Sequence, residues 1–269
     1  MTIRTGFIGL GSQGGPMAHK MLDGCFALTV WARRPEALEP YTAKGAEGAA
    51  SVAQLGAVCA HVGVCVVDDA GVAEICDQLI PAMRPGSLLA IHSTILPDSC
   101  IALEARCMER GIAFLDAPVS GGGPAAEAGT LTVMCGGSAD AFEQARPVFA
   151  TFAGLNVHLG PAGSGQRAKI VNNTLMAANM GLGLAALDAG EALGIDRKAL
   201  ADLIKASSGR SFGFEVLARL PSPVAFAHGA PLLAKDTNLL RNILPGNEAA
   251  DQLRSAAEPF LTAATGKPI

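Results

Sequence analysis

The stretch GFIGLGSQGGPM, residues 6–17, determines how the first half of the chain folds. An apolar segment typical of a buried strand leads into a glycine-rich turn and then a predicted helix, with Pro16 in its first turn. Gly9, Gly11 and Gly14 have the spacing GxGxxG. Such glycines allow a tight turn and a close approach of backbone to a pyrophosphate, beside the unpaired N–H groups of a helix N-terminus. We therefore expect a dinucleotide here; the alternative is a glycine turn in an ordinary βα unit. The expected contacts are Gly9, Leu10, Gly11, Ser12, Gln13 and Gly14.

The first half of the chain repeats this order of an apolar run followed by an amphipathic stretch. Continuous runs of valine, isoleucine and leucine between helices are typical of a parallel sheet that is covered on both faces. The repeated order predicts a doubly wound α/β domain of the Rossmann type. The apolar runs are IRTGFIGL (3–10), FALTVWA (26–32), VGVCVV (62–67), LLAIHST (88–94), IAFLDAP (112–118) and LTVMCGG (131–137), with predicted helices at 71–83 and 97–111.

The alternation ends near residues 156–165, and the sequence beyond Gln166 contains no convincing strand. Residues 166–194 predict one long helix that ends at Gly194, because glycine is common just past a helix C-terminus. Its many small residues would let another helix approach closely. RKALADLIKASS, residues 197–208, predicts a shorter helix.

The chain is therefore predicted to contain two domains, a Rossmann domain over residues 1–162 and an all-helical domain over residues 163–269, with the long helix between them. Half of the 269 residues are hydrophobic and only 16% are charged. This charged share is low for a small solvated surface, so we expect a partner subunit to cover apolar surface in a homodimer or homotetramer.

The composition argues against several other classes of function. The net charge is −4 and lysine and arginine form no run, which argues against nucleic-acid binding. The uncharged segment 170–187 contains three asparagines and fits a buried helix better than a membrane span. The N-terminus leaves no room for a signal peptide before the first strand. Seven scattered cysteines indicate buried free thiols in a reducing cytoplasm, and neither they nor the five histidines have metal-ligand spacing.

Two arginines, Arg33 and Arg34, follow the second predicted strand in VWARRPEAL, residues 30–38. NAD-binding folds commonly place a carboxylate there to accept from the ribose 2′-hydroxyl, but no Asp or Glu occurs before Glu36. A guanidinium instead matches the 2′-phosphate of NADP with bidentate donors. The arginines therefore favour NADP(H) over NAD; the alternative is a solvated pair at a strand end.

Two further loops follow predicted strands, where open α/β sheets bind ligands. HSTILPDS (92–99) offers Ser93 and Thr94, either to a ligand or as a cap for the helix that begins near Pro97. DAPVSGGG (116–123) offers a hydroxyl and exposed N–H groups that could hold a carboxylate. The alternative for the second loop is a glycine turn without a ligand.

The segment KIVNN places Lys169, Asn172 and Asn173 on one face of the long predicted helix. These groups either bind a substrate oxygen or form a solvated helix edge, because burying them without partners is unfavourable. In AKDTN, Lys235 and Asp236 form a charge pair that, by spacing alone, is typical of a surface.

In this order, GFIGLGSQGGPMA, HSTILP, DAPVSGGGPAAEAGTLTVMCGG, GSGQRAKIVNN and LLAKD resemble the motifs of the β-hydroxyacid dehydrogenase family. The resemblance extends over roughly residues 3–245. It implies a Rossmann domain followed by a helical domain, and interconversion of small 3-hydroxy acids and the matching aldehydes or ketones with NAD or NADP.

The resemblance also implies roles for individual residues. Lys169 matches the catalytic lysine of the family's KxxNN motif, and Asn173 matches the amide that helps to hold the substrate. The substrate carboxylate is expected at Ser120, Gly121 and Gly122. Further cofactor contacts are expected at Arg33, Val66, Val67, Thr94 and Lys235.

The sequence departs from the family pattern in CVVDDAG after the fourth predicted strand and in stopping at Ile269, where family members commonly continue with a helical tail. Without that tail, part of the wall near the active site is expected to be missing or to be supplied by a partner subunit. Two alternatives to a hydroxyacid dehydrogenase are an imine reductase and a non-catalytic NADP-binding sensor or interaction protein. Retention of Lys169 disfavours both, since relatives of these kinds tend to lack the lysine.

Overall fold

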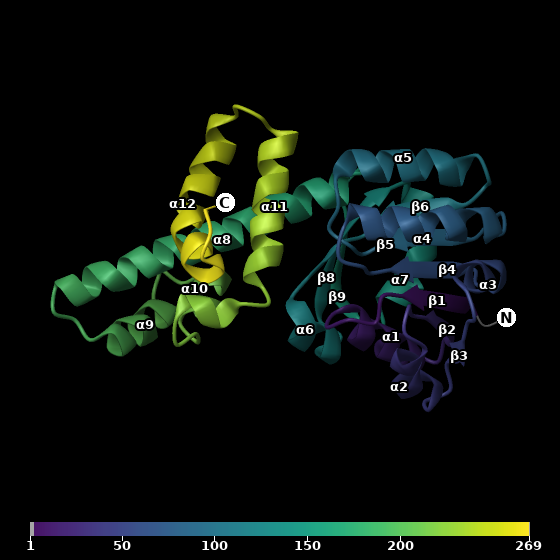
Figure 1. Cartoon of the computed structure of the whole chain (residues 1–269), viewed down its shortest axis with the longest axis horizontal. Helices are drawn as coiled ribbons and strands as arrows, with labels where there is room; N and C mark the ends of the chain where they lie inside the picture. The colour runs from purple at the N-terminus through teal and green to yellow at the C-terminus, as the bar shows by residue number, and fades with distance from the viewer. Residues whose placement is uncertain (1–2, 269) are drawn as a thin grey trace. The chain divides into compact units, whose positions relative to one another are not determined.

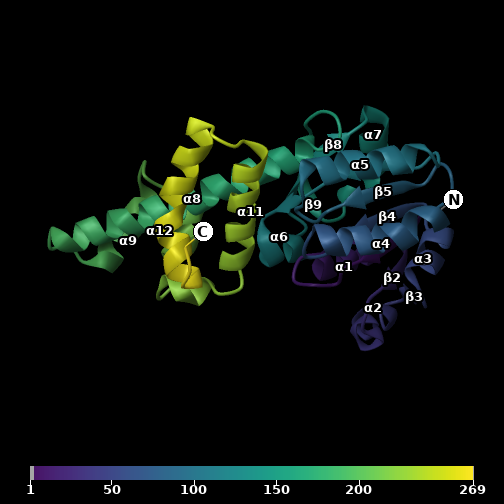
Figure 2. The ribbon, with the colours of Figure 1, turned by 45° about the horizontal axis from the view of Figure 1, so that its top comes forward.

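The computed structural model describes residues 3–268 and contains two compact units, which divide between Lys169 and Ile170 (Figures 1 and 2). The division falls inside the long helix α8, Ser164–Ala192. The sequence-based boundary between residues 162 and 163 lies just before that helix. The first unit is α/β and the second is helical, which confirms the predicted fold class.

The first unit is built on a twisted sheet with the strand order β3-β2-β1-β4-β5-β6-β8-β7, and β9 pairs with β8. Strands β1 to β6 are parallel to one another, as the apolar runs predict. The strands are β1 Arg4–Ile8, β2 Ala27–Trp31, β3 Glu47–Gly48, β4 His61–Val64, β5 Leu88–Ile91, β6 Ala113–Asp116, β7 Val119–Ser120, β8 Leu131–Gly137 and β9 Ala153–His158.

The far end of the sheet departs from the all-parallel prediction. Strand β8 runs antiparallel to β6 and β7 and follows them through α6. Strands β3, β7 and β9 are not evident from the sequence. Two of these strands contain two residues each, and β9 is interrupted by glycine and polar residues, so none of them forms a sustained apolar run.

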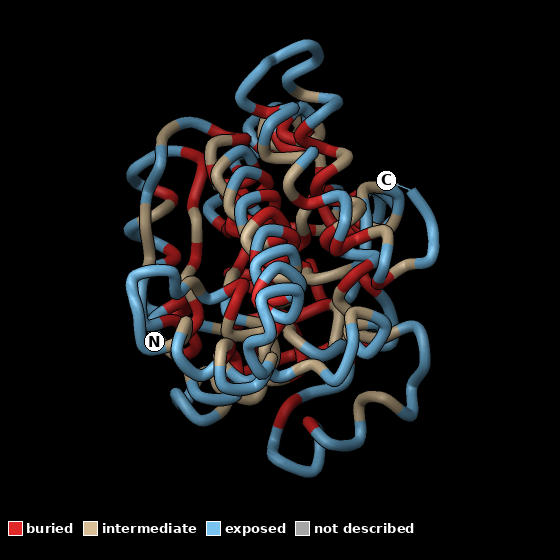
Figure 3. Tube along the Cα trace, turned by 90° about the vertical axis from the view of Figure 1, so that its left-hand side faces the viewer, coloured by how far each residue is buried: buried red, intermediate tan, exposed pale blue. Residues whose placement is uncertain are grey.

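Two separate apolar clusters cover the two faces of the sheet. One packs α1, α6 and α7 against it, with Phe7 and Phe149 at its centre. The other packs α3, α4 and α5 against the opposite face, around Leu55 and Leu79. The trace in Figure 3 shows buried segments inside and exposed loops outside. The helices of this unit are α1 Gly14–Asp23, α2 Glu39–Thr42, α3 Val52–Val58, α4 Asp69–Ala82, α5 Pro97–Met108, α6 Gly122–Ala128 and α7 Ala139–Phe149.

In the second unit, helices pack around the remainder of α8, and small residues make that packing possible. A Cβ atom at Gly181 would lie 1.9 Å from the carbonyl oxygen of Ala256, and one at Gly190 would lie 2.1 Å from a methyl group of Leu200. The small residues of α8 therefore contact helices of the same chain. These helices are α9 Arg197–Ala206, α10 Phe212–Leu217, α11 Ala230–Ile243 and α12 Glu248–Thr265.

Helix α8 also has the length and apolar composition that would allow a helix to cross a membrane. Half of its most apolar window is buried inside the protein, as in a core helix. Of the seven cysteines, all are free thiols and Cys25 is exposed, which corrects the expectation that all are buried.

Two buried histidines, His61 and His92, pack against Phe149 in the core of the first unit. Burial lowers the pKa of His61 from 6.5 to about 3, with a further contribution from His92. Burial also lowers the pKa of His92 to about 4, against the opposing effect of a 2.8 Å hydrogen bond between its Nδ1 and the carbonyl oxygen of Ala117. Both rings are therefore neutral in the folded protein at neutral pH.

We predict that the free energy of unfolding falls as the pH falls below about 6.5, the ordinary histidine pKa. In that range the unfolded chain binds protons at both histidines while the folded protein does not, so stability is complete above 6.5 and is lost toward pH 4. Urea unfolding at successive pH values measures this slope. His61→Gln should flatten it, whereas the exposed His228→Gln should not; equal slopes for both variants would contradict the prediction.

Candidate functional site

The glycine-rich turn lies at the point where the strand order of the sheet reverses. Ile8 at the end of β1 is in register with Val64 at the end of β4, and β2 flanks β1 on its other side. Residues 9–13 follow β1, and Val66 and Val67 follow β4. Doubly wound sheets bind ligands in the crevice at this switch point.

The glycines of the turn differ in what surrounds them. Gly9 has φ +99°, and a Cβ there would lie 2.0 Å from the carbonyl oxygen of Cys65. A Cβ at Gly14 would lie 2.0 Å from the carbonyl oxygen of Gly9. These two glycines are therefore required for the turn itself. A Cβ at Gly11 would meet no atom of the described residues within 4 Å, so this position leaves room for a ligand.

Helix α1 begins directly after this turn, with Gln13 as its N-cap. The side chain of Gln13 does not cap this end, so the N-cap residue leaves the first N–H groups of the helix without a side-chain acceptor of its own. A pyrophosphate suits such a helix end, because the groups donate hydrogen bonds and the helix dipole favours negative charge. The residues present therefore fit a dinucleotide.

Arg33 and Arg34 are exposed at the end of β2. The guanidinium of Arg33 forms an ion pair with Glu74 of α4, with Nη2 2.5 Å from Oε2. The side chains of the pair are 65% and 57% exposed. No acidic residue stands at the end of β2 itself, but Glu74 on α4 supplies a carboxylate to Arg33. This contact is not evident from the sequence.

The loop after β5 is held by hydrogen bonds to its backbone and to one hydroxyl. Ser93 Oγ accepts a hydrogen bond of 2.8 Å from the backbone N–H of Val66. The N-cap of α5 is Leu96, and no side chain of the described residues caps that helix. Neither Ser93 nor Thr94 therefore occupies the N-cap position of α5. Thr94 is half-buried beside the end of β4.

The loop after β6 and β7 approaches the glycine-rich turn. Gly121 and Gly122 have φ values of +128° and +71°, conformations that favour glycine. A Cβ at Gly123 would lie 3.2 Å from the carbonyl oxygen of Ser12. The predicted carboxylate loop and the predicted cofactor turn are thus neighbours, with Ser120 half-buried at the start of this loop.

The start of α8 is fixed by a buried carboxylate that the sequence analysis missed. Asp116 at the end of β6 is fully buried, and its Oδ1 and Oδ2 accept hydrogen bonds of 2.7 and 2.8 Å from the N–H groups of Gly163 and Gln166. Burial raises the pKa of Asp116, and the backbone hydrogen bonds oppose this shift. Lys169 follows Gln166 by three residues and is 7% exposed.

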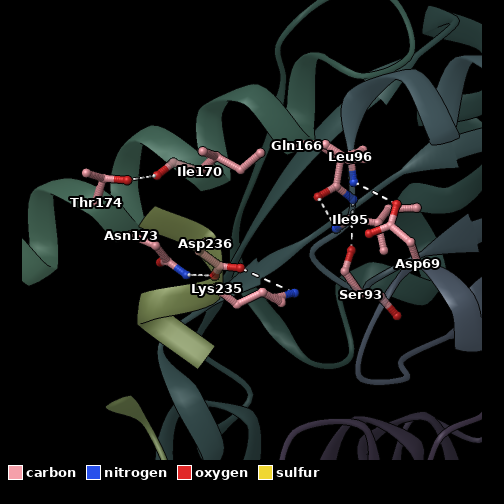
Figure 4. Close-up of polar contacts among 10 residues, drawn as sticks. All are labelled: Asp69, Ser93, Ile95, Leu96, Gln166, Ile170, Asn173, Thr174, Lys235 and Asp236. Atoms are coloured by element: carbon pink, nitrogen blue, oxygen red, sulfur yellow. Dashed lines mark hydrogen bonds and ion pairs between the residues drawn. The ribbon is translucent and has the colours of Figure 1, made fainter. Parts of the chain in front are cut away.

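In the second unit, Asn173 and Asp236 form a buried pair (Figure 4). The Nδ2 of Asn173 donates a 2.7 Å hydrogen bond to Oδ2 of Asp236, and Lys235 Nζ lies 3.3 Å from Oδ1. Because a carboxylate only accepts, the amide nitrogen of Asn173 must face Asp236, and its oxygen faces away. Asn172 is half-buried and donates to that oxygen at 3.3 Å.

The burial of these groups corrects two interpretations. Lys169 and Asn173 do not form a solvated helix edge, and Asp236 is buried rather than part of a surface charge pair. Helical spacing could have indicated the second point, because Asp236 lies three residues after the buried Leu233 and four before the buried Leu240. No group of three or more His, Cys, Asp or Glu side chains within residues 3–268 is arranged to hold a metal ion.

Comparison with known families agrees with this geometry. Residues 4–160 match the NAD binding domain of 6-phosphogluconate dehydrogenase. Residues 163–267 match the NAD-binding domain of NADP-dependent 3-hydroxyisobutyrate dehydrogenase. The chain belongs to the β-hydroxyacid dehydrogenase family. It is thus an oxidoreductase. The family, the fold class and the N-terminal nucleotide-binding domain that the sequence predicts are confirmed.

Individual family members are similar over nearly the whole chain. NAD-dependent L-serine dehydrogenase of Pseudomonas aeruginosa is 36% identical, over 93% of this chain and 88% of that protein. The structure of Mycobacterium tuberculosis 3-hydroxyisobutyrate dehydrogenase with L-serine has a TM-score of 0.87 and 28% identity, covering 98% of this chain and 96% of that one. Psf3 in complex with NADP+ and 2-OPP has a TM-score of 0.81 and 26% identity, covering 96% and 93%.

Proposed function

We propose that this β-hydroxyacid dehydrogenase interconverts a small 3-hydroxy acid and the matching semialdehyde or keto acid, with NADP as cofactor and Lys169 as general acid and base. The observation that carries the proposal is the burial of Lys169 on α8, one helical turn before Asn173. Burying an ammonium or amine group is unfavourable unless it has a defined polar role.

In this proposal each group of the chain has one task. Ser120 and the N–H groups of Gly121 and Gly122 hold the substrate carboxylate, which leaves the carbinol carbon near the glycine-rich turn. During oxidation Lys169 takes the hydroxyl proton as the carbonyl forms, and during reduction its ammonium group returns that proton. When bound, the nicotinamide accepts or supplies the hydride.

The structure supports a specific orientation for Asn173. Because Asp236 accepts from its Nδ2, the Oδ1 of Asn173 is the atom available to accept from a substrate hydroxyl or an ammonium group. Lys235 beside Asp236 adds positive charge, which suits an anionic substrate or cofactor group.

L-serine is a sound first substrate to test. It is a small 3-hydroxy acid, and it is named both for the Pseudomonas relative and for the Mycobacterium structure. We propose the wider class of small 3-hydroxy acids, because the predicted grip on the substrate uses only its carboxylate and hydroxyl. An assay panel should therefore contain L-serine, L-threonate and 3-hydroxyisobutyrate, with imines to test the imine reductase alternative.

We predict that Lys169→Ala lowers turnover by about 10²- to 10⁴-fold, the usual contribution of a general acid or base. Binding of NADPH, followed by its fluorescence, should change little. Lys198→Ala, which removes an exposed lysine of α9, is the matched control. Near-normal turnover in Lys169→Ala would remove the lysine from the mechanism. Tight NADPH binding by the wild type without turnover of any substrate would favour a sensor.

The proposed preference for NADP rests on Arg33. The ion pair between Arg33 and Glu74 affects the strength of that preference. An exposed ion pair such as Arg33–Glu74 contributes only about 0–1 kcal/mol. A dianionic 2′-phosphate offers more charge and more acceptors to the same guanidinium, so it can replace Glu74. Glu74 therefore reduces the preference for NADPH without abolishing it. Arg34 is proposed as a helper or as a group that stacks on the adenine.

We predict that Arg33→Asp lowers the ratio of kcat/KM for NADPH to that for NADH by about 10- to 100-fold, the loss expected for charge-assisted hydrogen bonds. Glu74→Gln should raise the same ratio, because it frees the guanidinium. Arg4→Asp is the control, since Arg4 forms a similar exposed ion pair with Glu47 at the other end of the strands. An unchanged ratio in Arg33→Asp would return both arginines to the role of surface charge.

We further propose that the protein is a homodimer or homotetramer that buries one face of α8. Val171, Leu175 and Leu182 are 44%, 46% and 59% exposed and lie on the same side of the helix. The glycines of α8 are used within the chain, so these larger side chains carry the argument for association. An apolar stripe of this kind is typical of a subunit interface.

We predict that Leu175→Glu combined with Leu182→Glu converts the wild-type oligomer to a monomer near 27.3 kDa, because two carboxylates would be buried at the interface. Light scattering after size-exclusion chromatography measures the mass. Leu203→Glu on α9 changes a side chain of similar exposure, 60%, and should leave the oligomer intact. A wild-type protein that is monomeric at micromolar concentration would contradict the proposal.

A further inference from the structure

Gln166, in the first turn of α8, is fully buried, and both polar atoms of its side-chain amide form hydrogen bonds. Its Nε2 donates a 2.8 Å hydrogen bond to the carbonyl oxygen of Ser93. Its Oε1 accepts a 3.1 Å hydrogen bond from the N–H of Ile95. These two groups belong to the peptides on either side of Thr94, so one side chain fixes the backbone around that residue.

The same loop is held from two other directions, of which Figure 4 shows the contact with Asp69. Ser93 Oγ accepts from the N–H of Val66, which ties the loop to the end of β4. Asp69 Oδ1 accepts from the N–H of Leu96 at 3.0 Å and from Ser99 Oγ at 2.7 Å, which ties it to α4. Gln166 joins this loop to α8.

The backbone of Gln166 is fixed in turn by Asp116, which also accepts from Gly163. A continuous series of hydrogen bonds therefore runs from Val66 through Ser93 and Gln166 to Asp116, across the ends of three neighbouring strands. Lys169 is three residues further along the same helix, on the adjacent turn.

We propose that Gln166 is a positioning residue that sets the distance between the Thr94 loop and the start of α8, and thereby between the cofactor and Lys169. The proposal rests on the roles given to Thr94 and Lys169 under the proposed function. An amide suits the task because it offers one donor group and one acceptor in fixed geometry, as the Ser93 carbonyl and the Ile95 N–H require. A side chain with only one of these leaves a buried backbone group unpaired.

The variant Gln166→Glu tests this requirement, because the new side chain can exist in two forms. A protonated carboxyl group donates to the Ser93 carbonyl and accepts from the Ile95 N–H, as the amide does. An ionised carboxylate cannot donate, and it faces the Ser93 carbonyl oxygen with like charge. Burial and the nearby Asp116 carboxylate raise the pKa of a carboxyl group introduced here. The variant should therefore resemble the wild type at low pH and lose that resemblance as the pH rises.

We expect the ratio of kcat for Gln166→Glu to kcat for the wild type to fall with rising pH by about 100-fold, the usual loss for a misplacement of about 1 Å. The Kd of NADPH should weaken over the same pH range, because the Thr94 loop is released as well. Gln166→Leu, which lacks both polar atoms, should be impaired at every pH. Asp116 and Cys100 are titratable groups beside Gln166, and Lys169 lies on the next turn; Gln166→Leu keeps all three and adds no charge, so it controls for changes in their titration.

A purely structural role for Gln166 predicts a different result, in which the melting temperature falls but kcat and the Kd of NADPH in the folded protein do not. That result overturns the proposal, as does a kcat ratio for Gln166→Glu that is constant with pH. Failure of the proposed function is separately visible. If Lys169→Ala were active, the catalytic role of the lysine would fail, while the pH dependence of NADPH binding in Gln166→Glu would still report on the Thr94 loop.

Discussion

The carboxylate of Asp116 at the N-terminus of α8 is the interaction on which the candidate site depends. A buried carboxylate is unfavourable unless several donors satisfy it, and here the N–H groups of Gly163 and Gln166 do so at the end of the helix where the dipole favours negative charge. The helix must lie very close to the sheet for this contact to form. A Cβ at Gly136 would lie 2.4 Å from Asp116 Oδ1, and one at Gly165 would lie 2.3 Å from the carbonyl oxygen of Met134. Glycines of CGG (135–137) and GSG (163–165) are therefore needed for this anchor, the contact between Asp116 and the start of α8, as well as for the turns.

This anchor explains how a site can be precise although its residues come from many loops. The polar groups that follow β4, β5 and β6 are joined to one another by hydrogen bonds, and the first turn of α8 is joined to them. A long helix that is fixed at its first turn carries that position forward to the next turn, where Lys169 lies. Sites supported in this way by a regular element keep their geometry better than sites on isolated loops.

The sequence predicts the parts of this structure that depend on local pattern and misses those that depend on tertiary partners. Sustained apolar runs predict the six main strands, and the absence of such runs after Gln166 predicts the helical unit. The role of Asp116 could not be predicted, because a strand-end aspartate acquires it only when residues 163–166 are folded beside it. Asp236 is similar, since its neighbour Lys235 suggests a surface pair, and only its helical spacing from buried leucines indicates burial. Residue type and order identify the family; they do not say which polar side chains are paired within the protein.

The same distinction applies to the choice of cofactor. The sequence shows no acceptor beside Arg33, but in the structure its guanidinium already has an acceptor in Glu74. Under the proposed role of Arg33, the free energy that distinguishes NADP from NAD is a difference between two ion pairs, one within the protein and one with the cofactor; salt screens both pairs, whereas a charge change at Glu74 removes only the first. Two family members with the same arginine can therefore differ in cofactor preference through the residue on α4 alone. An arginine after the second strand should be assessed together with the charge that faces it across the sheet edge.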